Sequence, residues 1–458
     1  MSKHYGEVVY LDVFGQPTII IDSYETAVAI LETSSASTSD RPRFVMAELV
    51  GLGYEFAVMG YSNAWRQRRR VFHSFFHQGV VSQYRPVHLR EVRRLLSKLL
   101  DEPEKFLHHS RHYVGGAIMS AVYGIEVKDQ NDKFMAIAER GGEIFSDVMA
   151  PGRYLVELVP LLARIPTWFP GASFKRKAAR WERDIHDVRT AAYNAACEAI
   201  ARGDAGLSMT SSLVDNSIRE HGGVSAEDEE IFKDVTGVAY AAGTDTASTI
   251  ATLTAFFLAM VVYPDVQRKA QAELDEIVGP DQLPEYSHQK SLPYVNAVMK
   301  ECSRWHTVTP LLVPHRSIKD VEYNGYLIPA GSVLIANAWS MSRDPVAYPD
   351  PDRFMPERYL KGGKMNPEAR DPLKFQFGFG RRICPGMPFS QDSLFLAIAS
   401  VLHAYTIRPP PSVDDSSNLM RLGPKTPSGG ALSYPDPFGC NITPRSELAA
   451  SIIQQSRF

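Results

Sequence analysis

Residues 377–386 read FGFGRRICPG, and the apolar run LFLAIASVL follows at residues 394–402. Cys384 therefore lies among three glycines, one proline and two arginines, shortly before an expected helix. Because proline fits the first turn of a helix, Pro385 predicts that this helix begins beside the cysteine. The positive end of the helix dipole and its free amides would then stabilise a thiolate at Cys384.

The residues around Cys384 indicate what such a thiolate would bind. Gly380 and Gly386 carry no side chains, so a flat and bulky partner could approach the sulfur closely. Arg382 offers a guanidinium fork to an anionic carboxylate. A single thiolate does not suit structural zinc, which takes four ligands. The pattern suits a planar metallocofactor with acid groups, which is haem.

The positions of the other cysteines bear on which kind of cysteine site the chain contains. Cys197, Cys302 and Cys440 are scattered along the chain, and no cysteine has a C-x-x-C partner. This distribution argues against a secreted disulfide scaffold and against a cysteine-rich zinc module. A buried structural thiol is the alternative interpretation of any single cysteine.

Composition and periodicity predict the fold class. The 458 residues are 44% apolar and 22% charged, and the net charge of −3 argues against a nucleic-acid-binding surface. Helical patterns dominate residues 81–305, including a well-delimited helix over residues 264–279. Gly15-Gln16-Pro17 predicts a turn between two N-terminal strands, and Asn324-Gly325 predicts a tight hairpin. We expect one domain over residues 1–458, mainly α with small β-sheets.

At this point the chain shows a resemblance to a known family. FGFGRRICPG matches F-x-x-G-x-R-x-C-x-G, the haem-binding loop of the cytochrome P-450 family. The resemblance implies that Cys384 binds the iron of heme b (iron protoporphyrin IX), between a long central helix and the Cys loop. It also implies that the remaining matched positions contact the cofactor, namely Phe377, Gly380, Arg382 and Gly386.

Two further segments resemble the family. KECSRWH, at residues 300–306, places Glu301 and Arg304 on one helical face, and FMPERY follows at residues 354–359. An isolated E-x-x-R is most often a solvated surface pair. The resemblance implies instead that Glu301, Arg304 and Arg358 form a buried ion network with a structural role.

The segment AGTDTA, at residues 242–247, interrupts a long apolar helical pattern over residues 235–263. A simple helix kink is one interpretation, because threonine can bond back to the preceding turn. The resemblance is to the oxygen-binding groove of the family, in which Thr246 would hold dioxygen and Asp245 would feed protons toward it. The apolar part is shorter than a membrane span, so a buried core helix is expected.

The basic segment WRQRRR, at residues 65–70, places Trp65 and Arg69 on one helical face. The resemblance implies that both contact haem propionates, together with His315 and Arg382. We expect the other arginines of the segment to lie on a solvated face that docks an acidic electron donor. Those arginines are Arg66, Arg68 and Arg70.

Together these motifs predict a haem-thiolate monooxygenase of a hydrophobic substrate, most similar to fungal microsomal members that serve secondary or xenobiotic metabolism. The implied partners are O2, NADPH-cytochrome P-450 reductase and possibly cytochrome b5; no nucleic-acid partner and a monomeric state are expected. Substrate contacts are expected in residues 48–62, in residues 149–174 and near residues 429–432. The alternatives are a reductase-independent peroxygenase or isomerase, and an inactive haem-binding remnant.

The fungal microsomal members of the family are tied to the endoplasmic reticulum by an N-terminal anchor. We expect that anchor, its hinge and the first helix to be absent from this chain.

Overall fold

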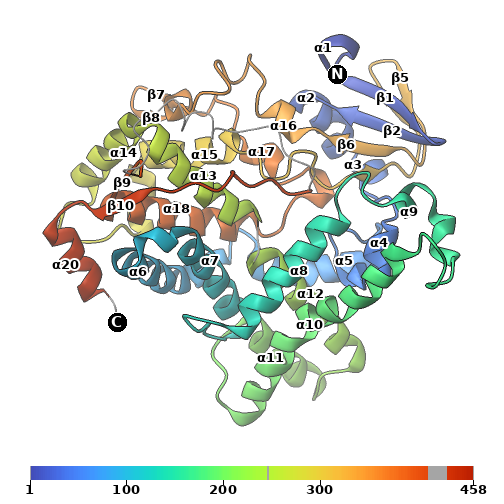
Figure 1. The fold of residues 1–458 in the computed structure, drawn as a ribbon, viewed down its shortest axis with the longest axis horizontal. Coiled ribbons are helices and arrows are strands. Elements are labelled where there is room, and N and C mark those ends of the chain that lie inside the picture. The colour runs from blue at the N-terminus through green and yellow to red at the C-terminus, as the bar shows by residue number, and fades with distance from the viewer. Residues whose placement is uncertain (1, 245–246, 411–430, 457–458) are drawn as a thin grey trace.

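The computed structural model describes residues 2–244, 247–410 and 431–456, and it is dominated by helices (Figure 1). The α-helices are α1 (Ser2–Tyr5), α2 (Tyr24–Ala27), α3 (Ser35–Thr38), α4 (Val45–Leu49), α5 (Asn63–Phe76), α6 (Arg85–Asp101), α7 (Phe106–Tyr123), α8 (Lys133–Val148), α9 (Leu155–Leu158), α10 (Ser173–Arg202), α11 (Met209–His221), α12 (Ala226–Thr244), α13 (Ala247–Val262), α14 (Pro264–Ile277), α15 (Pro293–Trp305), α16 (Ala338–Met341), α17 (Leu373–Gln376), α18 (Met387–Ala404) and α20 (Glu447–Gln455).

Short helical turns and strands connect these helices. The π-helical turn is η1 (Val28–Thr33), and the 3-10 turns are η2 (Leu52–Tyr54), η3 (Val81–Tyr84), η4 (Pro103–Lys105), η5 (Pro160–Arg164), η6 (Tyr286–Ser291), η7 (Pro356–Tyr359) and η8 (Gly380–Arg382). The strands are β1 (Val8–Val13), β2 (Gln16–Ile21), β3 (His315–Arg316), β4 (Val321–Tyr323), β5 (Tyr326–Ile328), β6 (Val333–Ala336), β7 (Leu360–Lys361), β8 (Lys364–Met365), β9 (Tyr405–Arg408) and β10 (Asn441–Pro444).

The largest sheet among the described residues has the strand order β1-β2-β6-β3 and lies near the N-terminus (Figure 1). Its first turn differs from the expected one. The positive φ angles fall at Phe14 (53°) and Gly15 (82°), and β2 already begins at Gln16. The turn is therefore one residue earlier than the predicted Gly15-Gln16-Pro17, because Asp12 accepts a hydrogen bond from the Gly15 amide and closes it.

The second predicted turn is confirmed. Asn324 and Gly325 have φ angles of 49° and 81°, and they join the antiparallel strands β4 and β5. Both angles lie in the region that a tight two-residue hairpin requires. The helix predicted over residues 264–279 is also present as α14, with Pro264 in its first turn.

The helical part contains two large hydrophobic cores among the described residues, one built from α7, α10 and α12 with their neighbours and the other around α13 and α18. The apolar residues of α13 are buried, as expected, among residues of α15 and α18. In the described part of the chain, no single helix is long and apolar enough to cross a membrane. Two consecutive helical segments meet these criteria only when they are taken together, Thr249–Val262 and Pro264–Ile277. The chain bends by 105° between them. The mainly helical fold with small sheets agrees with the predicted fold class.

Candidate active site

The loop that carries Cys384 connects α17 to α18 through the short turn η8. The Cys384 amide donates a hydrogen bond of 2.7 Å to the carbonyl oxygen of Phe377, whose own side chain is half-buried. Gly378 supports this tight return of the chain with a φ of 83°. The backbone therefore holds the cysteine at a defined position ahead of α18.

The start of α18 differs from the expectation. The helix begins at Met387 with Gly386 as its N-cap, and Pro388 rather than Pro385 lies in its first turn. Cys384 thus precedes the helix, and the backbone amides of Gly386 and Met387 are directed at its sulfur. These amides and Arg69 favour the thiolate, but burial outweighs them and raises the pKa of the Cys384 thiol. The amides near the start of the helix thus act on Cys384 in the expected direction.

The Cys384 side chain is nevertheless accessible. Neighbouring protein nevertheless desolvates the thiol, because it surrounds the sulfur closely enough to raise its pKa. The exposed sulfur is therefore available to a bound group.

Gly380 and Gly386 have different roles in the loop. At Gly380, where φ is 54°, an added Cβ would stand 2.3 Å from the carbonyl oxygen of Leu31 in η1. At Gly386 an added Cβ would meet only the Cys384 sulfur, at 3.9 Å. Gly386 thus keeps the space beside the sulfur open, whereas Gly380 lets the loop pack against η1 rather than clearing room for a cofactor.

Arg382 is buried and makes three hydrogen bonds to carbonyl oxygens. It donates to Ser39 at 2.7 Å, to Phe56 at 3.1 Å and to Met59 at 2.8 Å. Its guanidinium lies 4.3 Å from the centroid of the Trp65 ring, and Trp65 donates to the same Phe56 carbonyl at 3.0 Å. The structure therefore brings these two predicted residues into direct contact.

Arg69 and His315 reach the same region from other elements. Arg69, on α5, donates to the carbonyl oxygen of Ile383, directly before the cysteine. His315, on β3, donates through Nδ1 to the carbonyl oxygen of Thr38 at 2.8 Å. Because Thr38 and Ser39 are adjacent, His315 and Arg382 are anchored on neighbouring residues.

Sequence reasoning missed a further member of this group, Arg41, which is buried. Its guanidinium donates to the carbonyl oxygens of Ala57 (2.8 Å), Val313 (2.8 Å) and Pro314 (2.9 Å). No local pattern separates Arg41 from Arg43, which is exposed and pairs with Glu48. Only the three-dimensional fold reveals the difference.

The basic side chains of this group, Arg41, Arg69, Arg382 and His315, have little negative charge around them. Burial lowers the pKa values of Arg69 and Arg382 to about 10. Burial and then the charge of Arg382 lower the pKa of Arg41, while burial and then Arg41 lower that of His315. A buried cluster of cations beside an accessible thiol suits a ligand that combines a metal with acid groups. The residues present therefore fit haem, with Cys384 toward the iron and the cations toward its acid groups.

The predicted ion network is present at the end of α15. Glu301 and Arg304 are fully buried and form two hydrogen bonds of 2.8 Å, while Arg358 donates to Glu301 at 3.1 Å. Burial lowers the pKa of Arg304, but the attraction of Glu301 outweighs it and raises that pKa overall. Arg304 also donates to three backbone carbonyl oxygens, those of Ser342, Pro351 and Arg353.

The basic face of α5 is not uniform. Arg66 and Arg70 are exposed, as expected. Arg68, in contrast, pairs at 2.6 Å with Asp234 of α12, whose side chain is only 2% exposed. Arg189 of α10 holds the same carboxylate. The expectation that Arg68 lies on a solvated face is therefore wrong, because a long-range partner draws it inward.

The predicted catalytic pair Asp245 and Thr246 lies outside the described residues, between the end of α12 and the start of α13. Gly243, in the same AGTDTA segment, packs against α7. A Cβ added there would stand 2.5 Å from two side-chain atoms of Ile118.

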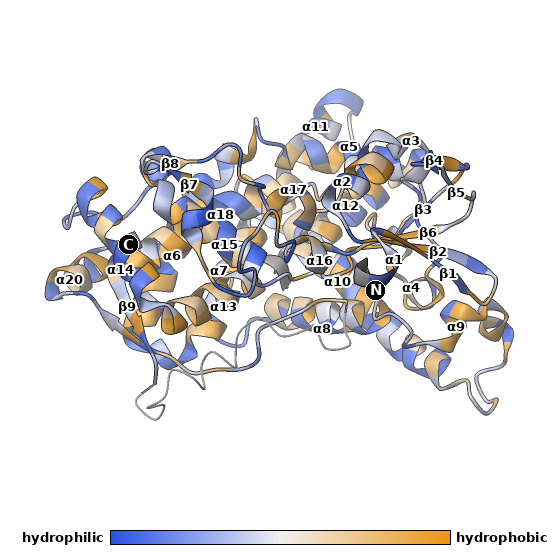
Figure 2. Ribbon diagram, turned by 90° about the horizontal axis from the view of Figure 1, so that it is seen from above, coloured by the Kyte–Doolittle hydropathy of each residue, from blue (hydrophilic) through white to orange (hydrophobic). Residues whose placement is uncertain are grey.

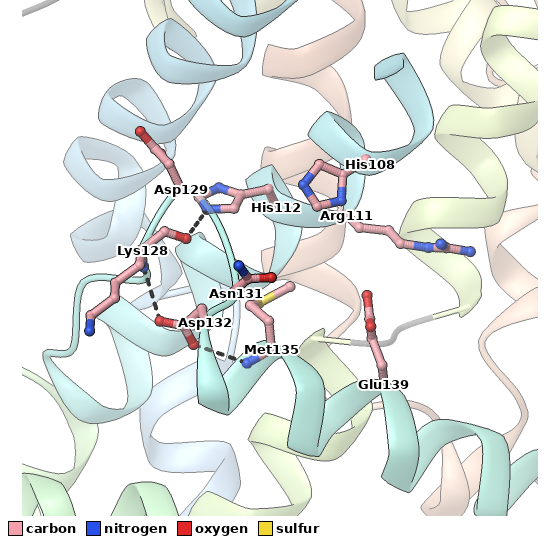
Figure 3. Close-up of a pocket in the computed structure, with 9 residues that line it drawn as sticks. All are labelled: His108, Arg111, His112, Lys128, Asp129, Asn131, Asp132, Met135 and Glu139. Atoms are coloured by element: carbon pink, nitrogen blue, oxygen red, sulfur yellow. Dashed lines mark hydrogen bonds between the residues drawn. The ribbon is translucent and has the colours of Figure 1, made fainter. Parts of the chain in front are cut away.

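A polar hollow lies elsewhere, between α7 and α8 (Figure 3). His112 donates to the Lys128 carbonyl at 2.8 Å on one side, and Asp132 caps the start of α8 on the other. Its volume of about 30 Å³ accommodates no more than one or two water molecules. The hollow contains none of the predicted site residues.

The sequence was compared with models of known families and with individual proteins, and both comparisons identify a family of haem-thiolate enzymes. The model of the family "Cytochrome P450" matches residues 1–431. The protein "Cytochrome P450 monooxygenase COX2" of Coprinopsis cinerea is 39% identical over 99% of this chain and 86% of its own length. "Cytochrome P450 monooxygenase ARMGADRAFT_974139" of Armillaria gallica is 38% identical over 99% of this chain and 88% of its own length. The chain belongs to the cytochrome P450 family and is a monooxygenase.

Proposed function

We propose that this enzyme inserts one oxygen atom of O2 into a hydrophobic organic substrate. NADPH would supply the electrons through a flavoprotein reductase, with cytochrome b5 as a further donor. The observation that carries the proposal is the accessible Cys384 thiol, with the Gly386 and Met387 amides directed at it and a cluster of buried cations nearby.

The residues have separate tasks in this proposal. Heme b, held by Cys384, supplies the activation of dioxygen. Arg69, Arg382 and His315 bind its acid groups. Thr246 holds a proton beside the reacting oxygen, and Asp245 replenishes that proton.

The central test is the absorption spectrum of the reduced protein exposed to carbon monoxide. Wild type should show a Soret band far to the red of histidine-ligated haem, and Cys384→Ser should lose it. Cys302→Ser is the matched control, because Cys302 is buried in the core around α13 and α18. A histidine-like band in wild type would contradict thiolate ligation.

A second test separates a monooxygenase from a peroxygenase or isomerase of the same fold. Turnover should require NADPH and the reductase, and Thr246→Ala should retain haem while diverting electrons to hydrogen peroxide. Equal product per NADPH in the variant and wild type would remove the proposed role of Thr246.

We further propose that the enzyme associates with the endoplasmic reticulum membrane, as its resemblance to microsomal members implies, and the exposed surface supports contact with lipid. Several large apolar side chains are exposed between residues 155 and 169, including Leu155 (62%), Leu161 (67%) and Trp168 (76%). Helix α9 of this segment and strands β1 and β2 lie at the same end of the molecule (Figure 2). Clustered exposed apolar residues of this kind favour contact with lipid. Reduced flotation of Trp168→Ser with phospholipid vesicles would support this placement; unchanged flotation would argue against it.

A further inference from the structure

We propose that Glu55 is a specificity-determining residue, whose carboxyl group donates a hydrogen bond to an oxygen atom of an otherwise apolar substrate. The substrate class is therefore a hydrophobic compound that carries a ketone or hydroxyl group, rather than a plain hydrocarbon. This inference deepens the proposed function and rests on it, because it assumes that the substrate lies beside a haem held by Cys384.

The backbone holds Glu55 at a defined position next to the predicted cofactor site. Its carbonyl oxygen accepts a hydrogen bond of 3.0 Å from the Val58 amide. The carbonyl oxygen of the next residue, Phe56, accepts from Trp65 and Arg382. Phe56 and Trp65 also belong to the hydrophobic core built from α7, α10 and α12. Glu55 therefore lies where this apolar core meets the residues expected to surround haem.

The carboxyl group of Glu55 is buried with few partners. The residue is 5% exposed, and its Oε1 accepts one long hydrogen bond of 3.3 Å from the Ala57 amide. Among the described residues, its Oε2 has no hydrogen-bonding partner. The nearby acid Asp234 opposes a charge on Glu55, and the two arginines beside it, Arg68 and Arg189, are bound to Asp234 itself. An acid in such surroundings keeps its proton and can donate it in a hydrogen bond.

Glu55 is also close to the reacting side of the site. Its carboxyl group lies within electrostatic reach of the Cys384 sulfur, which is accessible. The adjacent Tyr54 packs against α12, where a Cβ added to Gly237 would stand 3.5 Å from the tyrosine ring. In the described part of the chain, the buried hydroxyl of Tyr54 likewise lacks a hydrogen-bonding partner. Buried polar groups normally have partners, and an oxygen-bearing substrate would supply one.

The test uses haem-loaded full-length protein and two pairs of probes that differ by one ketone, tetralin with α-tetralone and adamantane with adamantanone. Dissociation constants are measured from the change in the haem absorption spectrum on titration. The preference for each ketone over its hydrocarbon should fall about three- to tenfold in Glu55→Met, compared with wild type at about pH 6. Methionine is similar in size to glutamate but donates no hydrogen bond.

The pH dependence separates hydrogen bonding from a purely structural role. Burial raises the pKa of Glu55 to about 7, so wild type should lose its preference for the ketone between about pH 6 and pH 8. Glu55→Gln keeps a donor that does not titrate, and it should retain the preference at both pH values. The other titratable groups that act on this region are Tyr54, Asp234 and Cys384, and all three are unchanged in this variant.

Glu273→Gln is the matched control. Glu273 is a half-buried carboxylate on α14 that accepts from the amides of Tyr294 and Val295, at the start of α15. Its replacement should leave both the preference for the ketone and the pH dependence of that preference as in wild type.

An unchanged preference in Glu55→Met would overturn the inference, as would failure of wild type to bind either ketone. If Glu55→Met does not fold, a wild-type preference that is equal at both pH values overturns it as well. These results would leave the haem enzyme intact. Failure of the wild-type chain to take up haem is a separate outcome that removes the proposed function too.

Discussion

Gly380 lies directly against the carbonyl oxygen of Leu31, where an added Cβ would stand only 2.3 Å from that oxygen. Its φ of 54° also disfavours any side chain. Gly380→Ala must therefore displace the Cys loop from η1, at a cost of about 2 kcal/mol or more. The expected result is a lower melting temperature and a reduced fraction of haem-loaded protein, measured by the pyridine haemochrome assay.

Gly386→Ala is the matched control for this change. Its φ is −86°, and the nearest atom to an added Cβ is the Cys384 sulfur at 3.9 Å. The fold should therefore tolerate it, and an equal loss of stability in both variants would contradict the assignment of Gly380 to packing.

The Glu301 network predicts a large effect on stability. Glu301→Gln leaves two arginines, Arg304 and Arg358, without their carboxylate in the protein interior. Removal of one partner from a buried ion pair costs about 3–5 kcal/mol. Denaturation by urea should show this loss, whereas Lys269→Ala, which breaks the exposed pair with Glu357, should cost less than about 1 kcal/mol.

Glu55 predicts a pH-dependent stability. Burial raises its pKa from 4.5 to about 7, and its side chain accepts one hydrogen bond, from the Ala57 amide. Between these two values the unfolded chain is ionised while the folded protein still binds the proton. Stability therefore decreases as the pH rises through this window.

Glu55→Gln removes the buried ionisable group and therefore the loss of stability at high pH. The variant should gain up to about 3 kcal/mol relative to wild type at pH 8, with a smaller difference at pH 5. Urea titrations at both pH values measure it, and Glu55→Asp should retain part of the pH dependence. A pH-independent difference between Glu55→Gln and wild type would show that Glu55 is ionised in the folded protein at both values.

The arginines of α5 predict two different phenotypes. Arg70→Glu, on the exposed face, should slow reduction by the flavoprotein several-fold at low salt, with the spectrum unchanged. Arg68→Glu should instead lower the melting temperature, because it places a second acid against the buried Asp234. Unaltered reduction kinetics in Arg70→Glu would exclude this face as the docking surface.

The sequence predicted those features whose cause is local. The Asn324-Gly325 hairpin, the helix after Pro264 and the Cys loop all follow from residue types at short spacing. The first hairpin was displaced by one residue because Asp12 closes the turn through the Gly15 amide, and the resulting positive φ at Phe14 is one that aromatic residues rarely adopt.

Features that depend on distant partners could not be predicted in this way. Arg41 and Arg43 look equivalent in sequence, and only the carbonyls of Ala57, Val313 and Pro314 distinguish them. Likewise, nothing near Arg68 indicates Asp234, which is 166 residues away.

The segment at residues 38–41 has a consequence for the order of assembly. Ser39 and Arg382 meet across 343 positions of the chain, and Thr38 and His315 meet across 277. The cations around Cys384 therefore come together only after both ends of the chain have been synthesised and have found each other. Haem is accordingly expected to enter a nearly complete protein late in folding, rather than to act as the nucleus around which the chain collapses.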